Sequence, residues 1–162
     1  MPKLLYKNYL LAMLVLVAAV TYFERFVLAL VLEPIKHDLQ LSDTQLGLMT
    51  GIVFAAFYAV AGIPIARWAD RGNRVSIAAA AVSLGGLMVS LCGVVGNFAQ
   101  LLLVRAGAAV GEAGAGPTAY SLISDYFDRA ERPRAMGIYS MAYIISMVIG
   151  YLLGGWLLEE LG

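Results

Sequence analysis

The sequence predicts an all-α membrane protein with about five transmembrane helices. Of its 162 residues, 61% are hydrophobic and only 14% are charged, whereas a soluble domain carries about 25% charged residues. The charges cluster between long apolar runs, and several runs reach the roughly 20 residues that a helix needs to cross a bilayer core. With a mean hydropathy of +0.81, the apolar excess is expected to face lipid rather than to fill a soluble core.

Five apolar runs separated by polar breaks predict the individual helices. The first is too long for a cleaved signal peptide and is interrupted only by Glu24 and Arg25. The second follows Ser42 and Asp43, either of which can cap its free backbone N–H groups. The expected spans are about 9–32, 44–66, 75–96, 99–124 and 135–158, within one N-terminal transmembrane domain over 1–162. The expected connectors are 33–43 with Pro34, 67–74, a tight turn at Asn97, and 125–134.

The distribution of basic residues predicts the orientation of the chain in the membrane. Five alternating spans bring three segments to one side, and these segments carry eight of the eleven Lys and Arg residues. They are Lys3 and Lys7; Arg67, Arg71 and Arg74; and Arg129, Arg132 and Arg134. Because cytoplasmic loops are enriched in Lys and Arg, we expect a cytoplasmic N-terminus and an external C-terminus.

Small residues recur at a spacing of four on the last two expected helices. Gly107, Gly111 and Ala115 share one face of the fourth helix, and Gly150 and Gly154 share one face of the fifth. Such faces allow a neighbouring backbone to approach closely. Pro117 removes a backbone hydrogen bond and is expected to bend the fourth helix.

Four charged residues fall inside expected spans, where an ionisable group is costly unless it is paired or hydrated. They are Glu24, Arg25, Arg105 and Glu112, and we expect them to meet in one polar pocket in the outer half of the membrane. One interpretation is a set of static ion pairs that holds the first and fourth helices together. The other is that a carboxylate among arginines exchanges a proton when its surroundings change, as proton-coupled transport requires.

Four segments resemble motifs of the major facilitator superfamily, and in particular its spinster-like branch. They are the string GIPIARWADRGNR from Gly62 to Arg74; Arg105 with Gly111-Glu112-Ala113-Gly114; Arg132-Pro133-Arg134 with Gly137-Ile138-Tyr139; and the pair Glu24-Arg25. In the first motif Ala66 stands where the family usually has glycine. The resemblance covers the whole chain, but only helices one to five of a family that has twelve.

The resemblance implies a transporter whose two six-helix bundles rock around a central substrate site. Asp70 would latch against the second bundle, supported by Arg71 and Arg74, although these arginines also fit simple topology determination. The branch implies an amphiphilic organic anion as substrate, such as a lysophospholipid or a sphingoid phosphate.

By the same resemblance, Arg25 and Arg105 would contact the anionic headgroup, with Tyr22 and Tyr120 as neighbours of the cavity. For the two tyrosines, packing or a place at the membrane interface explains their presence equally well.

The leading hypothesis is therefore the N-terminal part of a secondary active, proton-coupled transporter in a bacterial inner membrane. The alternative is a truncated, non-transporting membrane fragment that associates with other membrane chains. Expected partners are a small-molecule or lipid substrate, the proton, the lipid bilayer and the missing C-terminal bundle. Because the sequence has no paired catalytic carboxylates, no His-based metal motif and a formal net charge of zero, we expect no enzyme, cofactor, metal site or nucleic-acid partner. We also expect that these 162 residues alone transport nothing.

Overall fold

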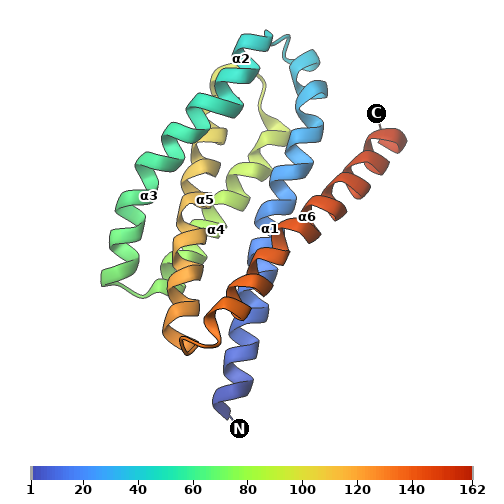
Figure 1. Cartoon of the computed structure of the whole chain (residues 1–162). Coiled ribbons are helices and arrows are strands. Elements are labelled where there is room, and N and C mark those ends of the chain that lie inside the picture. Colours follow the sequence, from blue (N-terminus) through green and yellow to red (C-terminus); the bar gives the residue numbers. More distant parts are fainter. Residues whose placement is uncertain (1, 162) are drawn as a thin grey trace.

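Helices make up nearly all of the computed structural model, which describes the backbone of residues 2–161 and the side chains of residues 5–156, 159 and 160. The elements are α1 (Pro2–Asp38), α2 (Asp43–Gly47), the π-helical η1 (Leu48–Val53), α3 (Phe54–Arg71), α4 (Arg74–Leu91), the 3-10 turn η2 (Cys92–Val94), α5 (Phe98–Tyr126) and α6 (Arg132–Leu161). The elements α2, η1 and α3 follow one another without a break and form one long rod (Figure 1). No strand occurs within residues 2–161, and the prediction of an all-α membrane fold is confirmed.

The first helix is longer than expected, because Pro34 does not end it. It continues to Asp38, so the connector that was expected over 33–43 shrinks to 39–42. A left-handed residue, Gln40 with φ 51°, ends the helix instead. The N–H of Leu41 donates to the carbonyl of Lys36 over 2.9 Å, and this bond across a left-handed residue is the Schellman pattern of a helix C-terminus.

The next helix begins as the sequence predicted. The Ser42 hydroxyl accepts from the N–H of Gln45 over 3.2 Å, and the Gln45 side chain accepts from the N–H of Ser42 over 2.9 Å. This reciprocal pair is a capping box. The tight turn at Asn97 also provides an N-cap, because the Asn97 side chain accepts from the N–H of Gln100 over 2.9 Å at the start of α5.

Four helices of the described chain are long and apolar enough to cross a membrane, namely Leu5–Asp38, Asp43–Arg71, Arg74–Val94 and Arg132–Trp156. The helix α5 is the fifth long helical segment of the bundle but is not among these four candidate membrane spans. It carries Arg105 and Glu112 together with many glycines and alanines, and it packs along both α3 and α4. A helix that is buried by its neighbours needs less lipid-facing apolar surface than the helices around it.

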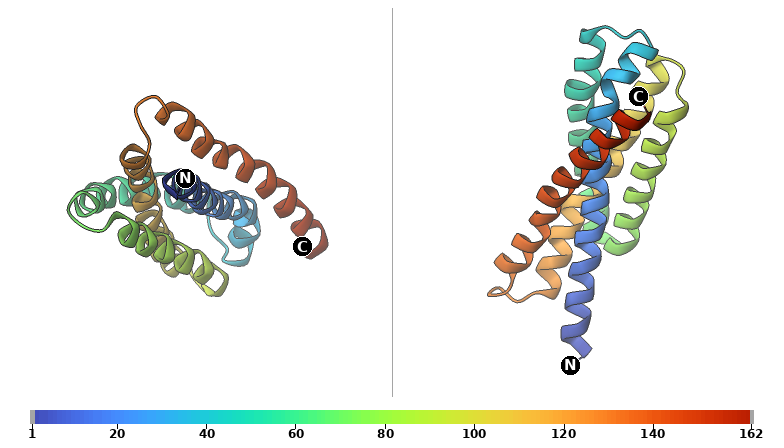
Figure 2. Two further views of the ribbon diagram at one scale, coloured as in Figure 1. Left: turned by 90° about the horizontal axis from the view of Figure 1, so that it is seen from below. Right: turned by 90° about the vertical axis from the view of Figure 1, so that its right-hand side faces the viewer.

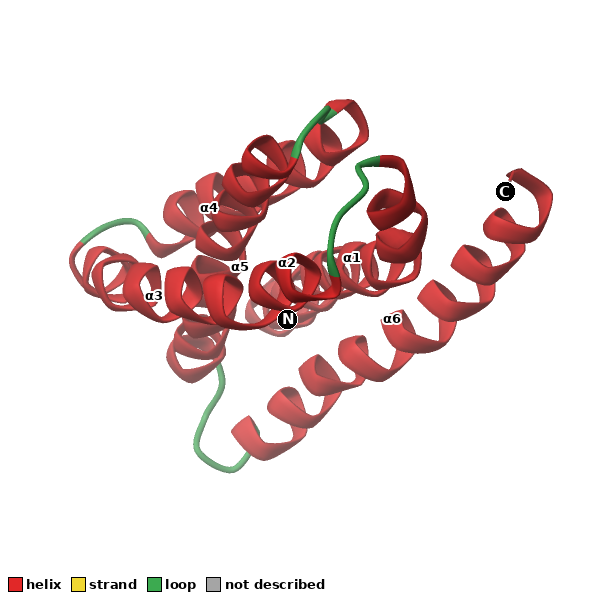
Figure 3. Cartoon of the chain, turned by 90° about the horizontal axis from the view of Figure 1, so that it is seen from above, coloured by secondary structure: helices red, strands yellow, loops and turns green. Residues whose placement is uncertain are grey.

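Close approach of small residues holds two groups of helices together. A Cβ atom built on Gly111 of α5 would lie 2.6 Å from the Cα of Gly85 on α4, so these backbones touch. On the other side of the bundle α1 packs along α6. There the Ser146 hydroxyl donates to the Ala19 carbonyl over 2.7 Å, and Gly150 lies against Phe26. The end-on views show α1 between α4 and α6 (Figures 2 and 3).

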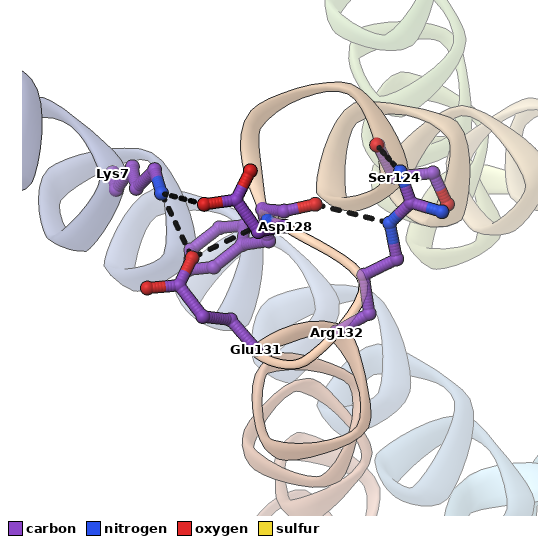
Figure 4. Close-up of polar contacts among 6 residues, drawn as sticks. Lys7, Ser124, Asp128, Glu131 and Arg132 are labelled. Atoms are coloured by element: carbon purple, nitrogen blue, oxygen red, sulfur yellow. Dashed lines mark hydrogen bonds and ion pairs between the residues drawn. The ribbon is translucent and has the colours of Figure 1, made fainter.

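The three basic segments lie at the same end of the bundle, as the alternation of spans predicted. The N-terminus, the α3–α4 turn and the α5–α6 loop meet there (Figure 1). The Lys7 ammonium contacts Glu131 at 2.8 Å and Asp128 at 3.7 Å, which ties α1 to the α5–α6 loop. Arg132 donates to the carbonyls of Ser124 at 2.7 Å and Phe127 at 3.0 Å, and so closes the C-terminal end of α5 (Figure 4).

Candidate functional site

Two of the charged residues expected inside the membrane form an ion pair between α1 and α5. A guanidinium nitrogen of Arg25 lies 3.5 Å from a carboxylate oxygen of Glu112. The Glu112 side chain is only 13% exposed, whereas that of Arg25 is 48% exposed. The pair therefore has one shielded partner, Glu112, and one partner, Arg25, that remains open to further contacts.

Arg105 is the most buried charged residue of the site. It is 7% exposed, and its buried Nε atom donates to no acceptor in the described part of the chain. Of the ion pairs among the described side chains, none includes Arg105. Because a buried donor without an acceptor is costly, this guanidinium has unused hydrogen-bonding capacity inside the bundle.

Both guanidinium groups also lie against Phe54, a residue that the sequence does not mark as part of the site. The Cζ atoms of Arg25 and Arg105 each lie 5.0 Å from the centroid of the Phe54 ring, within the range of cation–π contact. Phe54 is 6% exposed and is the first residue of α3, directly after the π-helical η1. The sequence does not mark Phe54 for contact with the arginines, because it is one of several phenylalanines in apolar runs. The π-helical turn before it has no sequence signature either.

Glu24 lies on a different side of α1, so the expected meeting of all four charges in one pocket is only partly correct. Its carboxylate approaches Gly86 of α4 and lines a mainly apolar groove of about 480 Å³ between α1 and α4. No ion pair joins Glu24 to Arg105 among the described side chains. The reason is helical geometry, because consecutive residues on a helix point about 100° apart, and Arg25 already faces α5. Glu24 and Glu112 both line one narrow gap between α1, α4 and α5.

The two tyrosines that were singled out pack against other tyrosines. The ring of Tyr22 meets Tyr143 edge-on with 5.2 Å between centroids, and Tyr120 meets Tyr139 in the same way at 5.3 Å. Tyr22 lines a small cavity of about 80 Å³ together with Arg25, Tyr58, Glu112 and Tyr139. Tyr120 is not among the described residues that line this cavity.

The residues of the expected latch differ in their surroundings. Arg74 forms an ion pair with Asp125 at the end of α5, and its Nε donates to the Ala69 carbonyl over 3.3 Å. Arg74 thus joins α3, α4 and α5 at the basic end of the bundle. Asp70 and Arg71 are exposed, and neither takes part in an ion pair among the described side chains.

Comparison with known proteins identifies the family. The sequence profile of the Major Facilitator Superfamily matches residues 14–162. The chain belongs to the major facilitator superfamily. Among curated proteins, this major facilitator chain is 40% identical to an MFS-type efflux pump of Mycolicibacterium smegmatis, over 92% of the chain and 35% of that protein. It is 30% identical to protein spinster homolog 1 of Xenopus tropicalis, over 82% of the chain and 26% of that protein.

Solved structures agree with the resemblance to the spinster-like branch. A bacterial homolog of the human lysosomal transporter Spinster, crystallised in an inward-facing and unoccupied conformation, superposes with a TM-score of 0.88 at 46% sequence identity. The match covers 94% of this major facilitator chain and 32% of that structure. The chain therefore spans about a third of the length of its relatives, and the matched part is their N-terminal part.

Proposed function

We propose that this chain supplies the first helices of a proton-coupled secondary transporter for an amphiphilic organic anion. The observation that carries the proposal is the convergence of Arg25 and Arg105 with one carboxylate, Glu112, in the interior of the bundle. Glu24 lies on the α4 side of α1, and the ion pair of Arg25 with Glu112 leaves Arg105 without a paired carboxylate among the described side chains. In a membrane interior a charge without a partner is costly unless it lines a substrate path, and a phosphate or carboxylate would neutralise it.

The headgroup of a lysophospholipid or a sphingoid phosphate matches the charge of this site. Arg25 is open enough to meet an incoming headgroup, and Arg105 has an unpaired Nε. The planar guanidinium donates two parallel hydrogen bonds to a phosphate or carboxylate. The cavity walls supplied by Tyr22, Tyr58 and Tyr139 are aromatic and suit the apolar part of such a molecule.

The proton-coupling part of the proposal rests on the two carboxylates. Glu112 is shielded and is bound to Arg25, while Glu24 faces the groove and has no ion-pair partner among the described side chains. Moving Arg25 onto a substrate anion would leave Glu112 without its counter-ion and favour its protonation. We further propose that the basic end of the bundle, with the N-terminus, faces the cytoplasm of a bacterial cell, in accordance with the bias of Lys and Arg. The exposed Asp70 and Arg71 would then latch against the second bundle.

The direct test is transport by the full-length gene product in proteoliposomes with an imposed proton gradient. We expect saturable uptake of 1-oleoyl-lysophosphatidylglycerol and none of monooleoylglycerol, which has the same acyl chain and no phosphate. Arg105→Lys keeps the charge but loses the planar fork, so it should abolish most uptake while expression persists. The matched control is Arg67→Lys at the exposed end of α3. Equal uptake of both lipids, or equal activity of the two variants, would reject the anion site.

Two further variants separate the candidate proton carriers. If Glu24 titrates during transport, Glu24→Gln should remove the pH dependence of uptake and leave insertion normal. If Glu112 does so instead, only Glu112→Gln should have this effect. Unchanged pH dependence in both variants would reject proton coupling through this site, and the non-transporting alternative would gain if no lipid is taken up under any gradient.

A further inference from the structure

We propose that Phe54 is a positioning residue that holds the Arg25 and Arg105 guanidinium groups against its ring and keeps Arg105 apart from Glu112 and available to an anion. This inference rests on the proposed function, because it assigns a task within the anion site. One buried ring lies 5.0 Å from each of two guanidinium groups, which come from different helices, α1 and α5. Two like charges therefore share one uncharged partner at the centre of the site.

The chemistry of the contact explains why a ring suits this task better than a carboxylate. A carboxylate in place of this ring would neutralise Arg105, whose charge attracts the substrate anion. An aromatic face attracts a cation through its quadrupole and carries no net charge. A guanidinium held over a ring also keeps its in-plane N–H groups free to donate to a phosphate or carboxylate.

Without the ring, Arg105 has an alternative partner. Arg25 already contacts Glu112 at 3.5 Å, and Arg105 lies seven residues before Glu112 on α5, two turns away on the same face. Loss of the ring contact would allow Arg105 to join Arg25 on this carboxylate. The empty site would then be neutralised by its own residues and would bind an external anion more weakly.

The backbone before Phe54 supports a role beyond core packing. The π-helical η1 ends at Val53, immediately before Phe54, and π-helical turns are rare and are often found at functional sites. Such a turn holds one residue more than an α-helical turn, so the same sequence in a regular α-helix would present Phe54 about 100° away from its observed direction. The irregular turn thus aims the ring at the two arginines. Tyr58, one turn later, stacks on Phe54 and lines the small cavity.

The test compares three variants of the full-length gene product in the proteoliposome assay with 1-oleoyl-lysophosphatidylglycerol. Phe54→Leu should raise KM about 10-fold, equivalent to ~1.4 kcal/mol, with little change in kcat. Phe54→Trp restores an aromatic face and should stay within about twofold of the wild type. The matched control is Phe57→Leu, which removes the same ring from a side chain that is 46% exposed on the same helix. An unchanged KM in Phe54→Leu, or equal defects in the Leu and Trp variants, would overturn the proposal.

A second measurement does not depend on transport and separates this inference from the proposed function. In a full-length Phe54→Trp protein in which every other tryptophan, Trp68 and Trp156 among them, is replaced by phenylalanine, the indole at position 54 reports directly on the arginines. Arg25→Gln and Arg105→Gln should each change its fluorescence emission, because each removes a cation from the ring. If neither substitution changes the emission, the ring does not hold the arginines, whatever the protein transports. If both change it and no lipid is taken up, the proposed function fails while the ring contact stands.

Discussion

Replacing Gly111 by alanine should force α4 and α5 apart. The new Cβ atom would lie 2.5 Å from the backbone nitrogen of Gly85, 2.6 Å from its Cα and 2.7 Å from the carbonyl oxygen of Ala81. Non-bonded carbon atoms prefer about 3.5–4.0 Å, so the helices must separate by about 1 Å. No side chain can rotate to relieve the clash, because all three atoms belong to the backbone of α4.

The expected cost follows from two opposing effects. Overpacking of a close contact costs about 1–3 kcal/mol, and the better helix propensity of alanine returns up to about 1 kcal/mol. We therefore expect Gly111→Ala to lower the free energy of unfolding by about 1–2 kcal/mol. Reversible unfolding by SDS in mixed micelles, followed by far-UV circular dichroism, measures this difference.

Two control variants make the prediction specific to this one contact. Gly116→Ala lies on the same helix with nothing within 4 Å of its new Cβ atom, and Gly85→Ala places a methyl group at an ordinary 3.7 Å from Gly111. Both should unfold at or above the SDS concentration of the wild type. If Gly111→Ala were as stable as Gly116→Ala, the α4–α5 contact would not be as close as the structure has it.

Three further predictions concern the ends of helices. The hydrogen bond from Lys7, followed by that from the Asp128 backbone, lowers the pKa of the Glu131 carboxyl below its usual 4.5. The stabilisation by the ionised Glu131 carboxylate is therefore complete above pH 4.5 and is lost as the pH falls through the lowered pKa. The difference in melting temperature between wild type and Glu131→Gln should accordingly shrink on acidification. Arg132→Gln leaves two carbonyls at the end of α5 without their donor and should cost about 1–3 kcal/mol in SDS unfolding, while the exposed Arg129→Gln should be neutral. Asn97→Ala removes the N-cap of α5 and should cost about 1 kcal/mol in the same assay; a value near zero would show that solvent replaces the cap.

The sequence by itself determined the class of fold, the number of long helical segments and the starts of several helices. Hydropathy and helical periodicity are local properties, so apolar runs of sufficient length are visible without coordinates. The cap at Ser42 and the turn at Asn97 depend on residues at most three positions apart, so the sequence predicts both, whereas the reciprocal bond from Gln45 and the capping role of Asn97 are seen in the structure. The sequence does not predict the end of α1, because Gln40 adopts the left-handed conformation that glycine usually provides, and Pro34 favours an earlier end.

Only the tertiary structure decided which charged residues meet. Helical spacing placed Glu24 and Arg25 at the same depth, but the packing of α1 between α4 and α6 sends Glu24 into the groove and Arg25 to Glu112. The partnership of Phe54 with both arginines depends on a π-helical turn and on the approach of three separate helices. Contacts of this kind join residues far apart in the chain, and they depend on how closely small residues such as Gly85 and Gly111 let the helices pack, which is a property of the assembled bundle.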